Sequence, residues 1–192
     1  MPYTITGPYL SELFRRAFTD ALHTPAARPT ADEWETALVK TVDLAQPCAN
    51  SGCAQGWYVF DNTRRPVCPY CGTPYAGRLP VLNLYSSHAG DTYRPDNHRL
   101  MVYPDQSLFP WHIDRTIFPN ERLTESGRRR VGHFVLRDDH WHLINEHMPD
   151  LFNVVTRKPI PAGESVVLED GMQLLLSRAQ GGRLAVIQMV ND

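Results

Sequence analysis

The chain has 192 residues, enough for one domain or two small ones, and its formal net charge is -2. This near-neutral balance gives no electrostatic footprint for binding nucleic acid or an anionic membrane surface. No apolar run approaches the roughly 20 residues that cross a bilayer, and the first residues lack the charged and apolar blocks of a signal peptide. We therefore expect a cytoplasmic protein with neither a nucleic-acid nor a membrane partner.

Residues 1–44 predict two helices joined by a tight loop. In the first, apolar residues at helical spacing form one stripe, which comprises Leu10, Leu13, Phe14, Ala17, Phe18, Ala21 and Leu22. Thr30 and Glu33 have the spacing of a capping box, which marks the start of a second helix. We expect that helix to end before Pro47 and to bury Trp34, Ala37, Leu38, Thr41 and Val42.

Residues 45–80 contain all four cysteines of the chain, and their spacing predicts a metal site. Cys48 and Cys53 form one short pair, Cys68 and Cys71 the other, and the hairpin-length insert between them fits a zinc ribbon. In this insert we expect a strand over 57–60, a turn at 61–62 and a return at 66–67, with Gly72 allowing a tight turn after the last cysteine.

The chemistry of four clustered cysteines favours a structural ion. In a reducing compartment such cysteines bind metal more readily than they form disulfides. Because sulfur fills all four positions of a tetrahedral zinc ion, no position remains for water or substrate. We expect one structural zinc ion; the alternative is unrelated free thiols or a redox-active Cys-x-x-Cys pair.

Residues 81–192 predict an antiparallel β-sandwich, so the whole chain is expected to be an α+β protein. Short runs of β-branched and aromatic residues alternate with turn residues, as is typical of sandwiches and barrels. The predicted strands cover residues 81–85, 98–103, 131–137, 141–145, 152–155, 165–169, 172–177 and 183–190.

One pattern in this region would support a metalloenzyme. His140 and His142 lie two residues apart on a predicted strand, so both rings share a face, and Glu146 follows. The spacing resembles part of the first metal motif of cupins, which implies a second, catalytic metal site. In the alternative interpretation, Trp141 and Leu143 point into the sandwich and the two histidines face solvent.

Residues 10–44 resemble the last helices of a protein-kinase carboxy-terminal lobe. The match is carried by Leu13-Phe14, Ala17-Phe18, Pro25, Arg28-Pro29, Glu33-Trp34 and Ala37-Leu38. The chain contains no glycine-rich loop, strand lysine, catalytic loop or Asp-Phe-Gly segment, which carry out phosphoryl transfer in kinases. The resemblance therefore implies the non-catalytic tail of a bacterial serine/threonine kinase.

The predicted sandwich resembles a divergent forkhead-associated (FHA) domain. The matching segments are 133–136, 141–143, Asn153, 158–160, Gly163, 166–168, 170–171 and 174–176. FHA domains bind phosphothreonine, but Arg130, Val131 and Val154 stand where the family has its phosphate-reading serine, arginine and glycine. A phosphothreonine-binding module that uses the basic run Arg128, Arg129 and Arg130 is a second alternative.

A kinase tail, a four-cysteine ribbon and a sandwich in this order are similar to kinases found with tellurium-resistance-type von Willebrand factor A (vWA) proteins. This resemblance implies a docking role with a vWA partner, whose adhesion-site Mg²⁺ accepts a carboxylate in trans. The candidate donors are Asp91, Asp96, Asp105, Asp114, Asp138, Asp139 and Asp150. We favour Asp114, since it lies between Trp111 and Phe118, which we expect to be exposed aromatic anchors.

Overall fold

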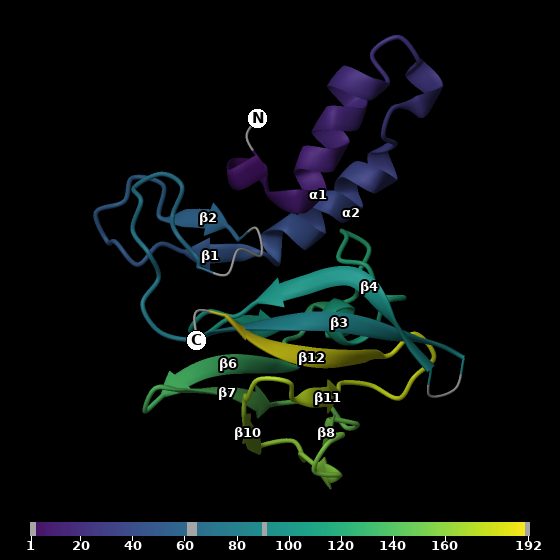
Figure 1. Ribbon diagram of the computed structural model, residues 1–192. Helices are drawn as coiled ribbons and strands as arrows, with labels where there is room; N and C mark the ends of the chain where they lie inside the picture. Colours follow the sequence, from purple (N-terminus) through teal and green to yellow (C-terminus); the bar gives the residue numbers. More distant parts are fainter. Residues whose placement is uncertain (1–2, 61–64, 90–91, 191–192) are drawn as a thin grey trace. The chain divides into compact units, whose positions relative to one another are not determined.

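The computed structural model describes residues 3–60, 65–89 and 92–190 (Figure 1). The chain divides into two compact units, residues 1–76 and 77–190. The first contains the helices and the cysteine segment together, and the second contains two antiparallel β-sheets. The predicted α+β class is confirmed.

Two helices form one part of the first unit. Helix α1 (Tyr3–Arg15) is interrupted at Gly7, where φ is 69°, and continues into the π-helical turn η1 (Arg16–Asp20). The 3-10 turn η2 (Pro25–Ala27) leads to α2 (Ala31–Val42). The predicted capping box at its start is confirmed: the amide of Glu33 donates to Oγ1 of Thr30 at 3.3 Å, and the amide of Thr30 donates to Oε2 of Glu33 at 2.7 Å.

The helices pack through fewer apolar side chains than the sequence predicts. Leu13, Ala21, Ala37 and Thr41 are buried, and the Phe14 ring lies edge-on to Trp34 with centroids 5.1 Å apart. Other members of the predicted stripes remain exposed, namely Phe18 (67%), Leu22 (50%), Leu38 (52%) and Val42 (69%). The expectation that Leu38 and Val42 are buried is wrong. Helical spacing marks an apolar face without showing whether another element of the chain covers it.

A two-stranded ribbon completes the first unit. Strands β1 (Ala45–Pro47) and β2 (Trp57–Val59) pair antiparallel, with Gln46 opposite Tyr58. The strand predicted at 57–60 is confirmed over 57–59, and its partner precedes the first cysteine. The predicted turn at Asp61-Asn62 lies outside the described residues. Val67, predicted to lead back to the second cysteine pair, forms a single bridge with Pro74.

The second unit contains two antiparallel sheets. One has the order β4-β3-β12-β11-β8-β9, and the other β10-β7-β6-β5. The bounds of the first sheet's strands are β3 (Leu79–Ala89), β4 (Thr92–Met101), β8 (Phe152–Asn153), β9 (Lys158–Pro159), β11 (Gln173–Leu175) and β12 (Arg183–Val190). Those of the second are β5 (Ser107–Leu108), β6 (Gly132–Arg137), β7 (His140–Asn145) and β10 (Ser165–Val167).

The two sheets face one another as the layers of a sandwich (Figure 1). Side chains at alternate strand positions fill the space between the layers. From the first sheet come Leu82, Leu84, Leu100, Leu174, Ala185 and Ile187, and from the second Leu108, Phe134, Trp141 and Leu143, all at most 2% exposed. Each predicted strand has a counterpart among these elements, and the predicted sandwich is confirmed.

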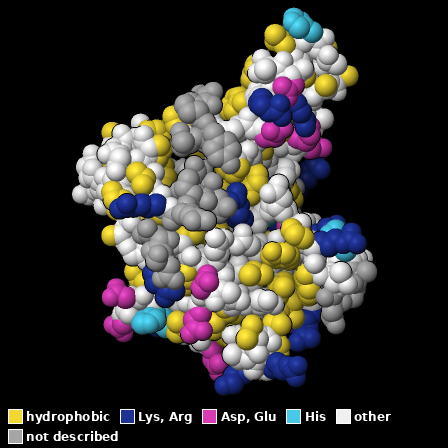
Figure 2. All heavy atoms as spheres, in the orientation of Figure 1, with side chains coloured by type: hydrophobic (Ala, Val, Ile, Leu, Met, Phe, Trp, Pro, Cys, Tyr) yellow, Lys and Arg dark blue, Asp and Glu magenta, His cyan; other side chains and the backbone are white. Residues whose placement is uncertain are grey.

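Two short helical segments lie between β5 and β6, where the sequence showed no periodic pattern. They are α3 (Pro110–Ile113) and the 3-10 turn η3 (Ser126–Arg128). Over the described ranges, no helix combines the length and apolar character that spanning a bilayer requires. On the face drawn in Figure 2, acidic and basic side chains are interspersed, in keeping with the formal net charge of -2.

Candidate metal centre

The four cysteines lie together in the first unit. Their sulfur atoms are all within 4.8 Å of one another, and they form the one group of three or more metal-ligating side chains among the described residues. The Sγ atoms of Cys48 and Cys71 are 3.5 Å apart, and those of Cys53 and Cys68 are 3.9 Å apart. A tetrahedron with metal–sulfur bonds of about 2.3 Å has edges of about 3.8 Å. The spacing therefore suits a tetrahedral metal ion.

Two tight turns position these sulfur atoms. In the first, the amide of Cys53 donates to the carbonyl of Asn50 at 3.0 Å, and the amide of Cys48 to the carbonyl of Gly56 at 2.7 Å. In the second, the amide of Gly72 donates to the carbonyl of Cys68 at 2.9 Å. Gly72 has a φ of 72°, a left-handed conformation that glycine adopts without a steric penalty. The role predicted for this glycine is confirmed.

The environment of each sulfur differs. Cys68 is fully buried, Cys48 and Cys53 are half-buried, and Cys71 is exposed. The Thr73 hydroxyl lies 3.2 Å from Sγ of Cys71, where it can donate to a thiolate, and together with the Thr73 backbone it lowers the pKa of Cys71 to about 6. The amide of Asn50 lowers the pKa of Cys48, but burial and the three neighbouring thiols outweigh it and raise this pKa to about 12. A bound cation would favour the thiolate form of the cysteines that hold it.

Two buried polar side chains lie on the ribbon that carries the cysteines. Gln46 and Tyr58 are 0% and 5% exposed and face each other across β1 and β2. Neither the Gln46 amide nor the Tyr58 hydroxyl has a hydrogen-bond partner within the described part of the chain. Burial, followed by the nearby charges of Cys68 and Cys48, raises the pKa of Tyr58.

The residues of the cupin-like pattern do not come together as a metal site. His140 and His142 do lie on the outer face of β7, while Trp141 and Leu143 are buried. Glu146 instead accepts two hydrogen bonds from Arg130, at 2.9 and 2.6 Å, and its Oε1 lies 2.7 Å from Nδ1 of His133. The spacing argument placed the two histidines correctly, but Glu146 follows the end of β7 and pairs with β6 and the segment before it.

The basic run is also engaged within the chain. Arg130 pairs with Glu146, and the guanidinium of Arg128 donates to the backbone carbonyl of Glu121. Asn153, which the FHA resemblance places near the phosphate, is buried, and its side chain accepts a hydrogen bond from the amide of Thr156 at 3.0 Å. Two of the three arginines therefore already have partners within the chain, which disfavours a phosphate site at this run.

The predicted partner anchors are less accessible than expected. Trp111 and Phe118 are half-buried, and the Trp111 ring stacks on Phe109 with centroids 4.4 Å apart, so the expectation that both are exposed is wrong. Asp114 is half-buried, and its Oδ1 accepts hydrogen bonds from the amide and the hydroxyl of Thr116, at 2.8 and 2.7 Å. One oxygen of Asp114 is therefore used inside the protein.

The other candidate acids differ in their surroundings. Asp96 is largely buried, and its Oδ2 accepts a hydrogen bond from Nε of Arg183 at 2.7 Å. The prediction that Asp96 is an exposed carboxylate available to a partner's Mg²⁺ is therefore wrong. Oδ2 of Asp150 accepts the amide of Arg178 at 3.0 Å. Asp105, Asp138 and Asp139 are exposed at positive φ, and Asp91 lies outside the described residues.

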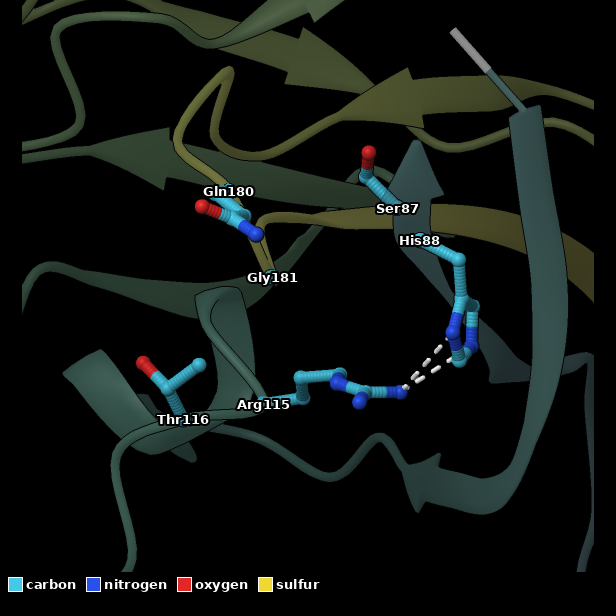
Figure 3. Close-up of a pocket in the computed structure, with 6 residues that line it drawn as sticks. All are labelled: Ser87, His88, Arg115, Thr116, Gln180 and Gly181. Atoms are coloured by element: carbon cyan, nitrogen blue, oxygen red, sulfur yellow. Dashed lines mark hydrogen bonds between the residues drawn. The ribbon is translucent and has the colours of Figure 1, made fainter. Parts of the chain in front are cut away.

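Sequence reasoning missed a small pocket in the second unit (Figure 3). It has a volume of about 210 Å³ and is lined by Ser87, His88, Arg115, Thr116, Gln180 and Gly181. These residues come from three segments that are far apart in the chain, and none belongs to a recognisable motif. Only the pairing of the strands brings them together, so no local pattern could have revealed the pocket.

Comparisons with protein-family models, with curated proteins and with solved structures found no match to this chain.

Proposed function

We propose that this chain is a non-catalytic interaction module of a bacterial serine/threonine kinase and that one structural zinc ion stabilises its first unit. The observation that carries the proposal is the group of four sulfur atoms at tetrahedral spacing. Zinc favours thiolate ligands in this geometry, and four protein ligands leave no coordination position for a substrate. A metal bound in this way stabilises the fold and takes no part in a reaction.

The helices of the first unit offer a surface on which a protein partner could pack. Phe18 lies in η1 and Leu22 in the turn just after it, while Leu38 and Val42 are four residues apart on α2 and therefore share a face. All four side chains are at least half exposed. Large exposed apolar groups at such spacing are typical of interaction surfaces, which supports docking as the role of this unit.

The partner that the resemblance implies is a vWA-domain protein with Mg²⁺ at its adhesion site. A carboxylate that completes the coordination of that Mg²⁺ must be exposed and must have an oxygen atom available. Asp105, Asp138 and Asp139 are exposed, and Asp114 has one oxygen that accepts none of the Thr116 hydrogen bonds. We therefore seek the ligand among these four residues.

Elemental analysis of the purified full chain tests the metal. We expect one zinc per chain, and we expect Cys53→Ser and Cys68→Ser to lose it. His140→Ala with His142→Ala is the matched control, because these histidines lie outside the cysteine group and should leave the stoichiometry unchanged. A wild-type chain without zinc would overturn the proposed centre, and a second zinc lost with the histidines would favour the metalloenzyme.

Affinity capture with a vWA domain tests the partner. Chelators such as EDTA also attack a thiolate-bound zinc, so loss of binding in EDTA is ambiguous. Binding that disappears on removing Mg²⁺ and returns with Mg²⁺ but not with Zn²⁺ would assign the effect to the partner's ion. Asp105→Asn, Asp114→Asn and the Asp138→Asn, Asp139→Asn double variant would then identify the carboxylate. Binding that is indifferent to Mg²⁺ and to all of these variants would exclude this mode of docking.

A further inference from the structure

The pocket in the second unit has a floor and walls fixed by backbone hydrogen bonds. The amide of Arg115 donates to the carbonyl of Gly181 at 2.9 Å, and the amide of Ser87 donates to the carbonyl of Gly182 at 3.0 Å. These bonds join the end of β3, the segment after α3 and the turn before β12. The pocket is therefore present before any ligand binds.

Gly181 is required for one wall of this pocket. Its φ is 88°, and a Cβ atom added there would lie 2.7 Å from Cγ2 of Thr116 and 3.0 Å from Oδ1 of Asp114. A larger residue would push the segment after α3 away from the turn. The close approach brings Arg115 and Gln180 to the same small volume.

The charge in the pocket comes from Arg115. Its Nη1 lies 3.0 Å from Nε2 and 3.5 Å from Nδ1 of His88, and Figure 3 shows the guanidinium reaching across to that ring. An arginine is always protonated, so it donates to the imidazole. No carboxylate pairs with Arg115 in the described part of the chain, whereas Arg16, Arg130 and Arg183 are each paired with an acid.

Neutral polar groups complete the lining. Ser87 lies across the pocket from Arg115 with its hydroxyl pointing away from the guanidinium, and Gln180 lies on a third side (Figure 3). The side-chain amide of Gln180 is exposed and has no hydrogen bond to another described residue. Asp114, which directly precedes Arg115, accepts the Thr116 hydrogen bonds at its Oδ1.

We propose that this pocket binds a phosphate group, with Arg115 as the principal ligand and His88 and Gln180 as further hydrogen-bond partners. The guanidinium fork matches the oxygen spacing of a phosphate. A phosphate has three terminal oxygens, so it can direct a separate oxygen toward the guanidinium, the imidazole and the Gln180 amide. The volume is below the roughly 300–1,000 Å³ typical of drug-sized ligands, which suits a phosphate and the atom that carries it.

This site is separate from the metal centre and from the basic run that the FHA resemblance singles out. It involves no cysteine, and Arg128, Arg129 and Arg130 are not part of its lining. Failure of the phosphate proposal would leave the zinc proposal untouched, because the two are tested by different measurements.

Amide chemical shifts of the full chain, recorded during a titration with inorganic phosphate at about 0.15 M ionic strength, provide the test. We expect shifts at residues 87–88, 115–116 and 180–181. Arg115→Gln should weaken binding about tenfold or more, as expected for loss of a charged hydrogen-bond donor, and His88→Gln should weaken it less. Arg129→Gln is the matched control, since it removes an exposed arginine outside the pocket and should bind like the wild type.

Peptides that carry phosphoserine or phosphothreonine identify the source of the phosphate. If they bind at the same amides and at least tenfold more tightly than inorganic phosphate, the ligand is a phosphorylated protein; otherwise it is free phosphate. The proposal is overturned if phosphate leaves these amides unmoved, if Arg115→Gln binds like the wild type, or if acetate binds at the same amides as tightly as phosphate.

Discussion

Replacing Cys68 with serine should unfold the first unit and leave the second intact. Cys68 is fully buried and holds one corner of the sulfur tetrahedron, 3.9 Å from Cys53. The apolar side chains buried in this unit, among its described residues, are few: Leu13, Ala21, Ala37, Leu44, Tyr58 and Phe60. A unit of this size with so small a core should depend for its stability on the metal ion that we propose.

The size of the effect follows from the linkage between binding and folding. With free zinc at about 1,000 times the dissociation constant, a bound ion adds about 4 kcal/mol to the free energy of unfolding. For a domain of this length, 1 kcal/mol changes the melting temperature by roughly 4–8 °C. Loss of the ion should therefore lower the transition of the first unit by roughly 15–30 °C.

Hydrogen exchange measured by mass spectrometry can follow the two units separately. In Cys68→Ser, or in the wild type after chelation, the amides of Cys48 and Gly72 should lose protection, because the metal holds their turns closed. Amides of β3 and β12 serve as the internal control and should stay protected. The reasoning is refuted if Cys68→Ser retains one zinc per chain, or if exchange of residues 45–75 is unchanged after the ion has been removed.

Four further predictions concern stability, each measured by denaturant unfolding. Thr30→Ala removes the capping box of α2 and should cost about 1 kcal/mol; a change confined to the second unit would contradict it. Asp96→Ala leaves Arg183 buried and unpaired, at 7% side-chain exposure, and should cost about 3–5 kcal/mol; a loss below 1 kcal/mol would show that water reaches the pair. Tyr58→Phe removes a buried hydroxyl without a partner and should stabilise the first unit by about 1 kcal/mol, whereas destabilisation would reveal a hydrogen bond to a metal-bound thiolate. Burial raises the pKa of Glu146, but Arg130 and His133 outweigh this and lower the pKa below its ordinary value. Ionised Glu146 therefore adds to the free energy of unfolding at pH values above its ordinary pKa, and this stabilisation is lost as the pH falls through the pKa of the folded state. The stability difference between wild type and Glu146→Gln should accordingly vanish in acid, and a difference that persists there would contradict the assignment.

Local patterns predicted most of the elements. The capping box at Thr30 and Glu33 depends on residues three positions apart, and strand alternation around Trp141 and Leu143 depends on the next residue but one. The cysteine group was also predictable, because its two turns are short and tetrahedral coordination requires four ligands.

Features that depend on contacts between residues far apart in the chain could not be predicted from local sequence patterns. Leu38 satisfies helical spacing yet is 52% exposed, since burial requires a second surface that periodicity does not reveal. Asp96 lies in a run of polar residues that is typical of a surface loop. It is largely buried because it pairs with Arg183, which lies 87 residues later in the chain. Arg115 and Gly181 meet for the same reason, which is why the pocket had no sequence pattern.

The pairing of β3 with β12 has a consequence for how the chain is made. Leu79 lies opposite Val190 and Ser86 opposite Arg183, so the first strand of the second unit pairs with the last strand of that unit. On the ribosome, β3 can pair with β4 at once but must wait for β12 before the six-stranded sheet is complete. The four cysteines have all been translated well before that point. The first unit can thus fold, and bind the proposed ion, before β12 has been made, while the sandwich closes only after β12 emerges.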